Sequence, residues 1–398
     1  MSTLQKLYDH PAHFEPLLPG GELLGCLAQR AKPAIEASLR LQGALTADTR
    51  AELRELVRAM NSYYSNRIEG QSTHPLNIER ALRQDFSERP DIAKRQRIAL
   101  AHIAAEKELQ ALGLSEAQAL TSETLRKAHE FLYKRLSEAD RKTEDGLEVS
   151  PGRWREVSVA VYRHEPPPAS AVPQFLARAD DIYGRPQGLE ALLVTAACAH
   201  HRLAWVHPFL DGNGRAGRLQ LHAALHRLSD GLWSVTRGLA QSRERYYLRL
   251  SEADMVRQGD LDGRGNLSQR MLVQWCEFFI DVCRDQVESM TSLLQPETLK
   301  RRLSALVHVR AAERKGYRKE LILPLLHVLA VGPVSRADFT QMTGLGETTA
   351  RKSVSQLLKD GMLKSDSHKG EVRIGIPLDS LNILFPDLYP EAAAALLE

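Results

Sequence analysis

The chain has 398 residues, and a hydrophobic fraction of 43% with 26% charged residues excludes a wholly disordered protein. Its formal net charge of +3 is too small to identify a nucleic-acid-binding protein. The charge is unevenly distributed, because residues 300–375 contain 15 Lys and Arg but only 7 Asp and Glu. A basic module attached to a mildly acidic body indicates a polyanionic partner for that module.

The N-terminal residues and the cysteines favour a cytoplasmic protein. The first residues, MSTLQKLYDHPAHFEP, lack the apolar segment of a secretion signal, and no apolar stretch is long enough to span a bilayer. The cysteines, at positions 26, 198, 276 and 283, show neither a CxxC pair nor a zinc-type spacing. We therefore expect a cytoplasmic protein with no membrane partner. Cys276 and Cys283 are expected on one buried helical face as inert core thiols.

Helical periodicity dominates the first three quarters of the chain. In residues 186–206 apolar side chains recur at alternating spacings of three and four, which predicts a helix with one continuous apolar stripe. A turn-rich break at residues 70–75 follows the second expected helix. The expected helices span residues 22–42, 46–68, 93–112, 122–138, 186–206, 214–229, 242–257 and 267–294.

Residues 150–165 follow the period of a strand instead. Val157, Val159 and Val161 alternate with polar residues, and the segment lies between a Pro-Gly pair and three consecutive prolines. We expect a short β-hairpin that packs on the helices, because an isolated hairpin is not stable alone.

The C-terminal quarter has a different pattern. A basic stretch at 295–320 is interpreted as a linker helix, and three helical patterns follow at 321–331, 335–342 and 347–359. Two short strands, from Leu363 and at 372–374, complete the order that predicts a winged helix. The expected fold is mainly α, divided into an N-terminal helical region (1–110), a central core (111–294), the linker helix (295–320) and a winged-helix domain (321–398).

The string HPFLDGNGRAGR at residues 207–218 carries the clearest chemistry. It connects two expected helices, so Gly212 to Gly214 form a tight loop at a helix N-terminus, where unpaired N–H groups and the helix dipole attract an anion. Arg215 and Arg218 are three residues apart and project from one face of that helix. Guanidinium groups bind phosphate oxygens in a bidentate manner. The pattern therefore predicts a phosphate site.

Two further groups in this string suit phosphate chemistry. Asp211 offers a hard oxygen ligand for Mg²⁺, and His207 has an ordinary pKa that suits a general base near neutrality. Together these residues indicate transfer of a phosphate-containing group from a nucleotide, although each alone is consistent with an ordinary turn. No GxxxxGK[ST] string occurs, which excludes a Walker-type loop, and His201 with His207 lacks a third ligand for zinc.

The string matches every position of the motif HPFx[D/E]GNGRxxR, and the chain resembles the Fic/Doc family over about residues 20–290. The resemblance implies a Fic-type helical bundle with a hairpin flap, which transfers AMP from ATP to a Ser, Thr or Tyr hydroxyl of a target protein or of the chain itself. It implies that His207 deprotonates that hydroxyl and that Asp211 binds Mg²⁺. The residues that it assigns to the phosphates of ATP are Gly212, Asn213, Gly214, Arg215, Ala216, Gly217 and Arg218.

The resemblance also gives roles to residues outside the motif. The hairpin at 150–165 would be a flap that holds the target segment by strand addition, with a simple structural ribbon as the alternative. Tyr246 or Tyr247 would contact adenosine, although paired tyrosines on an amphipathic helix are also typical of half-buried packing. The Doc branch of the family has an altered phosphate loop and acts as a kinase, so Gly214 and both arginines favour AMP transfer.

The string SNRIEG at residues 65–70 matches the inhibitory pattern [S/T]xxxE[G/N] of the same family. Ser65 and Glu69 share a helical face, and Gly70 is expected to end the helix. A carboxylate there opposes the helix dipole, which favours a functional role over a solvated helix end. The resemblance implies that Glu69 pairs with Arg218 and removes it from the γ-phosphate, so that the N-terminal region inhibits the enzyme.

Two other functions stay open at this point. One is removal of AMP from a modified protein, with Glu69 positioning a water molecule. The other is a DNA-binding regulator whose helical body senses a nucleotide. The expected recognition helix carries Thr348, Arg351 and Lys352, which suit DNA phosphates, but a protein partner or a homodimer suits a winged helix equally well.

Overall fold

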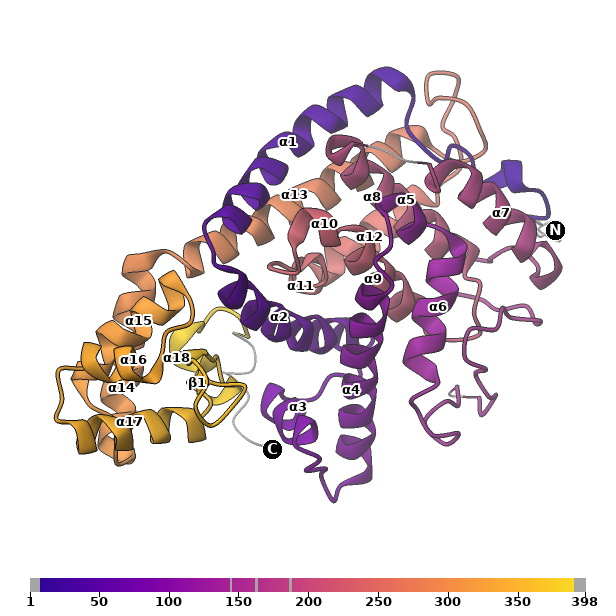
Figure 1. Cartoon of the computed structure of the whole chain (residues 1–398). Helices are drawn as coiled ribbons and strands as arrows, with labels where there is room; N and C mark the ends of the chain where they lie inside the picture. The colour runs from indigo at the N-terminus through magenta and orange to yellow at the C-terminus, as the bar shows by residue number, and fades with distance from the viewer. Residues whose placement is uncertain (1–7, 144, 162–163, 186–187, 390–398) are drawn as a thin grey trace.

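The computed structural model describes residues 8–143, 145–161, 164–185 and 188–389. The protein is mainly helical, as expected. A large helical body, which ends with α13 (Gln269–Leu293), is followed by a smaller C-terminal module, which begins with α14 (Pro296–Glu313) (Figure 1). In the described ranges the single regular sheet is a two-stranded ribbon in that module. Within the same ranges no helix combines the length and the apolarity that crossing a membrane requires.

The helices of the body agree largely with the sequence pattern. The expected helix at 122–138 ends early, at Tyr133, and the one at 214–229 is divided into α9 and α10, while α3, α7 and α11 were not anticipated. The body contains α1 (Gly21–Gly43), α2 (Ala47–Ile68), α3 (Pro75–Leu82), α4 (Pro90–Ala111), α5 (Glu116–Ala119), α6 (Ser122–Tyr133), α7 (Val172–Tyr183), α8 (Leu189–Val206), α9 (Asn213–Ala224), α10 (His226–Ser229), α11 (Val235–Gln241), α12 (Arg243–Ala253) and α13 (Gln269–Leu293).

Helix α8 lies at the centre of the body and positions the loop of the motif. It packs against α1, α7, α9 and α13, and α1 and α13 are the two long helices that lie side by side in Figure 1. Small residues such as Ala196 and Ala199, both fully buried, let these neighbours approach α8 closely. The C-terminal end of α8 and the N-terminal end of α9 are therefore fixed by the core, with residues 207–212 between them.

Helix α2 begins and ends as the sequence predicts. The hydroxyl of Thr46 accepts a hydrogen bond from the Thr49 N–H at 3.3 Å and caps the first turn. Gly70 follows the last turn with a φ of 71°, a conformation that glycine adopts without the steric cost of a side chain. The helix ends beside α9, with which it packs.

The antiparallel pairing expected over 150–165 is much shorter than predicted in the residues that the structure describes. They form a loop with one isolated antiparallel bridge, between Val161 and His164, while residues 162–163 lie outside the described residues. The physical reason is that the loop pairs with other segments: the Arg155 N–H donates to the Pro208 carbonyl at 2.8 Å. Val157 is 49% exposed, so the alternating valines do not mark a buried strand face.

The C-terminal module has the element order from which a winged helix was predicted. It contains α14 (Pro296–Glu313), α15 (Ile322–Val331), α16 (Arg336–Met342), α17 (Glu347–Lys359), β1 (Leu363–Lys364), β2 (Arg373–Ile374) and α18 (Leu381–Leu384). The strands are antiparallel, with Leu363 opposite Ile374. The division into four regions stays a prediction, and α4, at the end of the proposed N-terminal region, packs against α6 and α9 of the core.

Helix α2 also contacts the C-terminal module along its length. The Thr49 hydroxyl donates to the Leu329 carbonyl at 2.7 Å, and Lys364 of β1 forms a 2.6 Å ion pair with Glu52. Near the other end, the hydroxyl of Tyr64 donates to the Leu388 carbonyl at 3.0 Å. Helix α2, whose C-terminal end lies beside α9, is therefore held by the C-terminal module.

Candidate active site

The loop between α8 and α9 is held in place by its own side chains. His207 follows α8 with a φ of 49°, in the left-handed region that non-glycine residues rarely adopt. Phe209 is fully buried and stacks on the ring of His129, with 3.8 Å between centroids. The amide of Asn213 accepts from the Phe209 N–H and donates to the Phe209 carbonyl, both at 2.9 Å. Asn213, which was expected at the phosphates, thus uses its side chain to fix the loop.

Asp211 presents an ionised carboxylate near the end of this loop, just before α9. The carboxylate accepts hydrogen bonds from the Gly212 N–H at 2.6 Å and from the Tyr133 hydroxyl at 2.9 Å. Burial raises the pKa of Asp211, but the charge of Arg215 and the Gly212 N–H outweigh burial and bring the pKa below its ordinary value. The side chain is 44% exposed, so one side of the carboxylate still faces solvent.

The two glycines at the start of α9 have no room for a side chain. Gly212 has a φ of 80°, and a Cβ on it would lie 2.4 Å from the ring of Tyr133. A Cβ on Gly214 would lie 2.4 Å from a carboxylate oxygen of Glu69. The first N–H groups of a helix have no partner within it, and no side chain caps α9. This end of α9 is therefore suited to an anion.

Ala216 and Gly217, which were also expected in the phosphate cradle, face the core. Ala216 is fully buried, and its N–H donates to the Gly212 carbonyl at 2.9 Å. A Cβ on Gly217 would meet the ring of His200 at 3.4 Å. The Gly212 N–H donates to the Asp211 carboxylate. The backbone N–H groups that can bind an anion are therefore those of residues 213–215.

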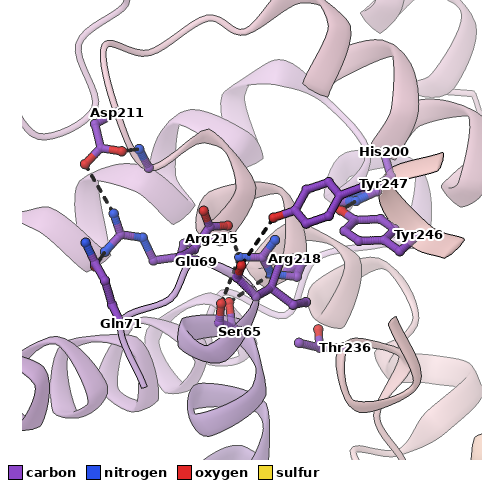
Figure 2. A network of polar contacts seen from close by, with 12 residues as sticks. Ser65, Glu69, Gln71, His200, Asp211, Arg215, Arg218, Thr236, Tyr246 and Tyr247 are labelled. Carbon is purple, nitrogen blue, oxygen red and sulfur yellow. Dashed lines mark hydrogen bonds and ion pairs between the residues drawn. The ribbon is translucent and has the colours of Figure 1, made fainter. Parts of the chain in front are cut away.

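Both arginines of the motif are buried and project toward α2 and the loop (Figure 2). Arg215 donates to the Tyr133 hydroxyl at 2.9 Å and to the side-chain oxygen of Gln71 at 3.1 Å. Arg218 is 1% exposed, and its Nε donates to the Ser65 hydroxyl at 3.0 Å. Buried guanidinium groups are costly without such partners.

Glu69 is the charged partner of Arg218, as the inhibitory pattern implies (Figure 2). Nη2 of Arg218 lies 2.5 Å from Oε1 of Glu69. Burial alone would lower the pKa of Arg218, but the Glu69 carboxylate raises it above its usual value. Because the same carboxylate lies against Gly214, it is at the positive end of α9. The structure thus brings Ser65, Glu69 and Arg218 together at the expected phosphate position.

His207 is neutral at physiological pH. Burial, followed by the charge of Arg155 and an electrostatic contribution from His164, lowers the pKa of His207 to about 4. Its imidazole is therefore ready to accept a proton. The backbone of this residue is also fixed, because Nε of Arg155 donates to the His207 carbonyl at 2.8 Å.

The two tyrosines of α12 lie in different surroundings. Tyr246 is 3% exposed and its hydroxyl contacts Nε2 of His200 at 2.8 Å, which places it in the core rather than at a ligand. Tyr247 is half-buried, and its hydroxyl donates to the Ile68 carbonyl at 3.2 Å, next to Glu69. Of the pair, only Tyr247 has a position that suits a contact with a nucleotide.

Three residues that support the loop were missed in the sequence. Arg155 donates to carbonyls of residues 206 and 207, Tyr133 links Asp211 with Arg215, and His129 fixes the carbonyl of Asp211. The Gly152 N–H donates to Nδ1 of His129 at 2.9 Å, so Nε2 carries the proton that points to Asp211. The expected strand segment also contains Arg153 and Arg163, so no local signal in the sequence distinguishes Arg155.

The residues around Asp211 fit Mg²⁺ that is shared with phosphates. The described residues contain no cluster of three or more His, Cys, Asp or Glu side chains that could hold a metal by themselves. Mg²⁺ often binds to one or two carboxylates and completes its coordination with phosphate oxygens and water. A single ionised and partly exposed carboxylate beside an anion-binding helix end meets that requirement.

Comparisons with known proteins find a family match over the residues that contain this loop. Residues 119–225 match the model of the Fic/DOC family. The chain is 31% identical over 195 residues to a protein adenylyltransferase Fic from Nematostella vectensis, covering 48% of this chain and 42% of that protein. A protein of the same name from Culex quinquefasciatus is 31% identical over 153 residues, covering 38% and 29%. The chain thus spans less than half the length of these relatives.

Solved structures share the fold. A Fic family protein from Desulfovibrio desulfuricans G20 superposes with a TM-score of 0.52 at 20% identity, covering 90% of this chain and 98% of that chain. Fic-1 from C. elegans superposes with a TM-score of 0.51 at 19% identity, covering 68% and 74%. The similarity to the first structure extends through most of the chain.

Proposed function

We propose that the protein is a self-inhibited adenylyltransferase that transfers AMP from ATP to a hydroxyl group of a target protein, because residues 119–225 match the model of the Fic/DOC family. The names of the relatives support AMP transfer in general. The observation that carries the proposal is the Arg218–Glu69 pair at the first turn of α9. In this pair the carboxylate of Glu69 contacts both the buried guanidinium of Arg218 and the anion-binding end of α9.

In the proposed reaction His207 acts as the general base. Its neutral imidazole takes the proton of the target hydroxyl while the hydroxyl oxygen forms a bond to the α-phosphorus of ATP. The bond from the α-phosphorus to the bridging oxygen breaks, and pyrophosphate leaves. The first N–H groups of α9, together with Arg215, stabilise the negative charge that builds up on the phosphates. Mg²⁺ held by Asp211 would neutralise part of the phosphate charge.

Inhibition follows from competition for the same donors. Glu69 occupies the guanidinium of Arg218 and the positive end of α9, which are the groups that we assign to the γ-phosphate. While the pair is closed, the triphosphate loses this contact and takes an unproductive position. Activation therefore requires that Glu69 and Arg218 separate, which a movement of α2 would bring about.

Intact mass spectrometry after incubation with ATP and Mg²⁺ tests the proposal. The Glu69→Gly variant should gain the mass of AMP, or transfer it to an added protein, at least tenfold faster than the unchanged protein. Glu55→Gly is the matched control, because Glu55 lies on the same helix and away from the motif loop, and it should keep the basal rate. If Glu69→Gly is as silent as Glu69→Gly with His207→Ala, AMP transfer is wrong. Gain of a phosphoryl group alone would indicate kinase chemistry.

Removal of AMP is a second candidate for the same site. The Glu69 side chain is 31% exposed, so its second oxygen is available to hold a water molecule beside the loop. In that reaction the water would lose a proton and form a bond to the phosphorus, the bond from the phosphorus to the target oxygen would break, and the target hydroxyl would take up a proton as AMP leaves. Release of AMP from a modified target that stops in Glu69→Gly, while AMP transfer rises, would identify this activity.

For the C-terminal module we propose a polyanionic partner, such as duplex DNA, that binds on α17. Arg351, Lys352 and Lys359 are exposed on this helix, whereas Val354 and Leu357 face the core. Of the ribbon residues, Lys364 is paired with Glu52. Binding to a duplex that weakens steeply with salt would support this partner. Binding that is independent of salt would favour a protein. The homodimer and the cytoplasmic location stay predictions.

A further inference from the structure

A cavity lies between α2, α4, α9 and α10, and no residue of the motif loop lines it. It has a volume of about 120 Å³. Its lining includes the apolar residues Leu109, Leu219 and Trp233 and the polar residues Asn61, Glu106 and His222. For comparison, an apolar cavity of about 150 Å³ in another protein binds benzene. The cavity is therefore large enough for a small organic molecule.

Glu106 brings a carboxylate to this cavity, where the effect of burial on its pKa outweighs that of the nearby Arg58 charge. Its two oxygens accept from Nδ2 of Asn61 at 3.0 and 3.1 Å. Within the described residues Glu106 forms no ion pair, and the nearby guanidinium of Arg58 is directed to Glu55 and Gln110. A buried carboxylate without a countercharge is unfavourable, so the cavity offers a place for a cation.

Asn61 supplies a second unsatisfied acceptor at the same place. The residue is 2% exposed, and in the described part of the chain its Oδ1 has no hydrogen-bond partner. Leaving a buried acceptor unpaired costs free energy that a ligand with N–H donors would recover. Asn61 and Glu106, from two helices, therefore line one cavity; Oδ1 of Asn61 lacks a donor, and Glu106 lacks an ion pair in the described part of the chain.

We propose that this cavity binds a small primary amine in its ammonium form. The ammonium group donates to Glu106 and to Oδ1 of Asn61, and a short apolar chain packs against Leu219 and Trp233. A water molecule would satisfy Asn61 but would leave Glu106 without a charge partner. An anion would be repelled by the carboxylate, and a neutral alcohol would gain only the apolar contacts and one hydrogen bond.

The titratable groups around Glu106 predict how amine binding depends on pH. Burial raises the pKa of Glu106 to about 7, and burial lowers the pKa of His222 to about 3, so this histidine is neutral and does not repel a cation. Because the ammonium requires an ionised Glu106, affinity should rise about tenfold from pH 6 to pH 8. The other titratable groups near the cavity are Glu55 and Arg58 on α2, His102 on α4, Glu116 on α5, and His226 and Arg227 on α10.

A bound amine would connect the two helices of the inhibitory pair. Asn61 lies one turn before Ser65 on α2, and Leu219 directly follows Arg218 on α9. The ligand therefore opposes separation of α2 and α9, and, if the proposed function holds, it strengthens inhibition. The binding itself does not depend on that function, because none of the assigned catalytic residues lines the cavity.

Isothermal titration calorimetry of the full chain with butylammonium chloride tests the proposal. We expect one saturable site at pH 8, about tenfold weaker at pH 6, with at least tenfold weaker binding of 1-butanol or tetramethylammonium. Glu106→Gln should weaken butylammonium at least tenfold. Glu116→Gln is the matched control, because Glu116 lines the cavity but is paired with Arg227, and it should change the affinity less than threefold.

Several results would overturn the proposal. Absence of saturable butylammonium binding at pH 8, or equal binding of 1-butanol, would show that the carboxylate selects no cation, and neither result requires a variant to fold. Unchanged hydrogen exchange of α2 in the bound protein would refute the connection between the helices. A silent Glu69→Gly variant would refute the proposed function without affecting the calorimetry.

Discussion

Arg218 of α9 and Glu69 at the end of α2 form a 2.5 Å ion pair across the boundary between the two helices. The same guanidinium donates through Nε to Ser65, one turn earlier on α2, at 3.0 Å. One buried cation is therefore held by two residues of a single helix. Because both partners move with α2, the position of α2 relative to α9 determines whether Arg218 is available.

Ser65→Ala should loosen this hold without removing the charge partner. Nε of Arg218 would lose its acceptor while it stays buried, at a cost of about 1–3 kcal/mol in the free energy of unfolding. The rate of AMP transfer should rise by roughly two- to tenfold, since a net hydrogen bond contributes about 0.5–1.5 kcal/mol. Urea denaturation and intact mass measure the two effects. A stable variant with an unchanged transfer rate would contradict the assigned role of Ser65.

Gly212→Ala should destabilise the protein and stop AMP transfer. At a φ of 80° a side chain costs roughly 1–2 kcal/mol, and the new Cβ would lie 2.4 Å from the Tyr133 ring, which must then move away from Asp211. Thermal denaturation and the activity of the Glu69→Gly background measure the result.

Gly25→Ala is the control for that substitution. Gly25 lies inside α1, and a Cβ there would meet nothing within 4 Å. Alanine should stabilise the helix by about 0.5–1 kcal/mol and leave activity unchanged. If both alanine variants had the same stability, the constraint at Gly212 would be absent.

Acid should destabilise the protein already between pH 6.5 and pH 5. Burial lowers the pKa of several histidines below the value of about 6.5 that they have in the unfolded chain. Below pH 6.5 the unfolded state therefore binds more protons than the folded state. The free energy of unfolding contributed by these histidines is then lost as the pH falls toward their folded pKa values. Each contributes up to about 1.4 kcal/mol per pH unit. Glu106, with a pKa raised to about 7, opposes this with one proton. The histidines are His102, His129, His200, His207 and His222.

The midpoint of urea denaturation, measured at pH 7.5, 6.5 and 5.5, checks the expected slope. The carboxylates with ordinary pKa values stay ionised in this range, so they do not mask the histidines. A midpoint that is constant or rises toward pH 5.5 would mean that these imidazoles are not buried in their neutral form.

Local signals in the sequence identified the parts of the site that depend on backbone conformation. Gly70 follows the end of α2, and Gly212 precedes the start of α9, both with a positive φ. Glycine adopts a positive φ without steric cost, so these two helix boundaries could be predicted from the sequence. The pairing of Glu69 with Arg218 was inferred from two motifs and not from periodicity. In each case residues close in sequence, or a long specific string, carried the information.

Tertiary contacts decided the residues that were predicted wrongly or missed. The valine alternation at 157–161 has the period of a strand, but Arg155 directs the backbone of this segment to the motif loop. Tyr246 and Tyr247 are adjacent on one helix, and only packing against His200 distinguishes the buried one. Such contacts join residues far apart in the chain, which a single sequence does not reveal.

Tyr64→Phe should partly release inhibition from the C-terminal side. The Tyr64 hydroxyl donates to the Leu388 carbonyl at 3.0 Å, and its loss leaves that buried carbonyl without this donor, at a cost of about 1–3 kcal/mol. Since Tyr64 precedes Ser65 on α2, hydrogen exchange of α2 and AMP transfer should both increase. Tyr317→Phe is the matched control, because the Tyr317 hydroxyl pairs with Arg310 inside the C-terminal module. It should lose similar stability with no gain in transfer, and an equal gain in both variants would exclude a specific link through α2.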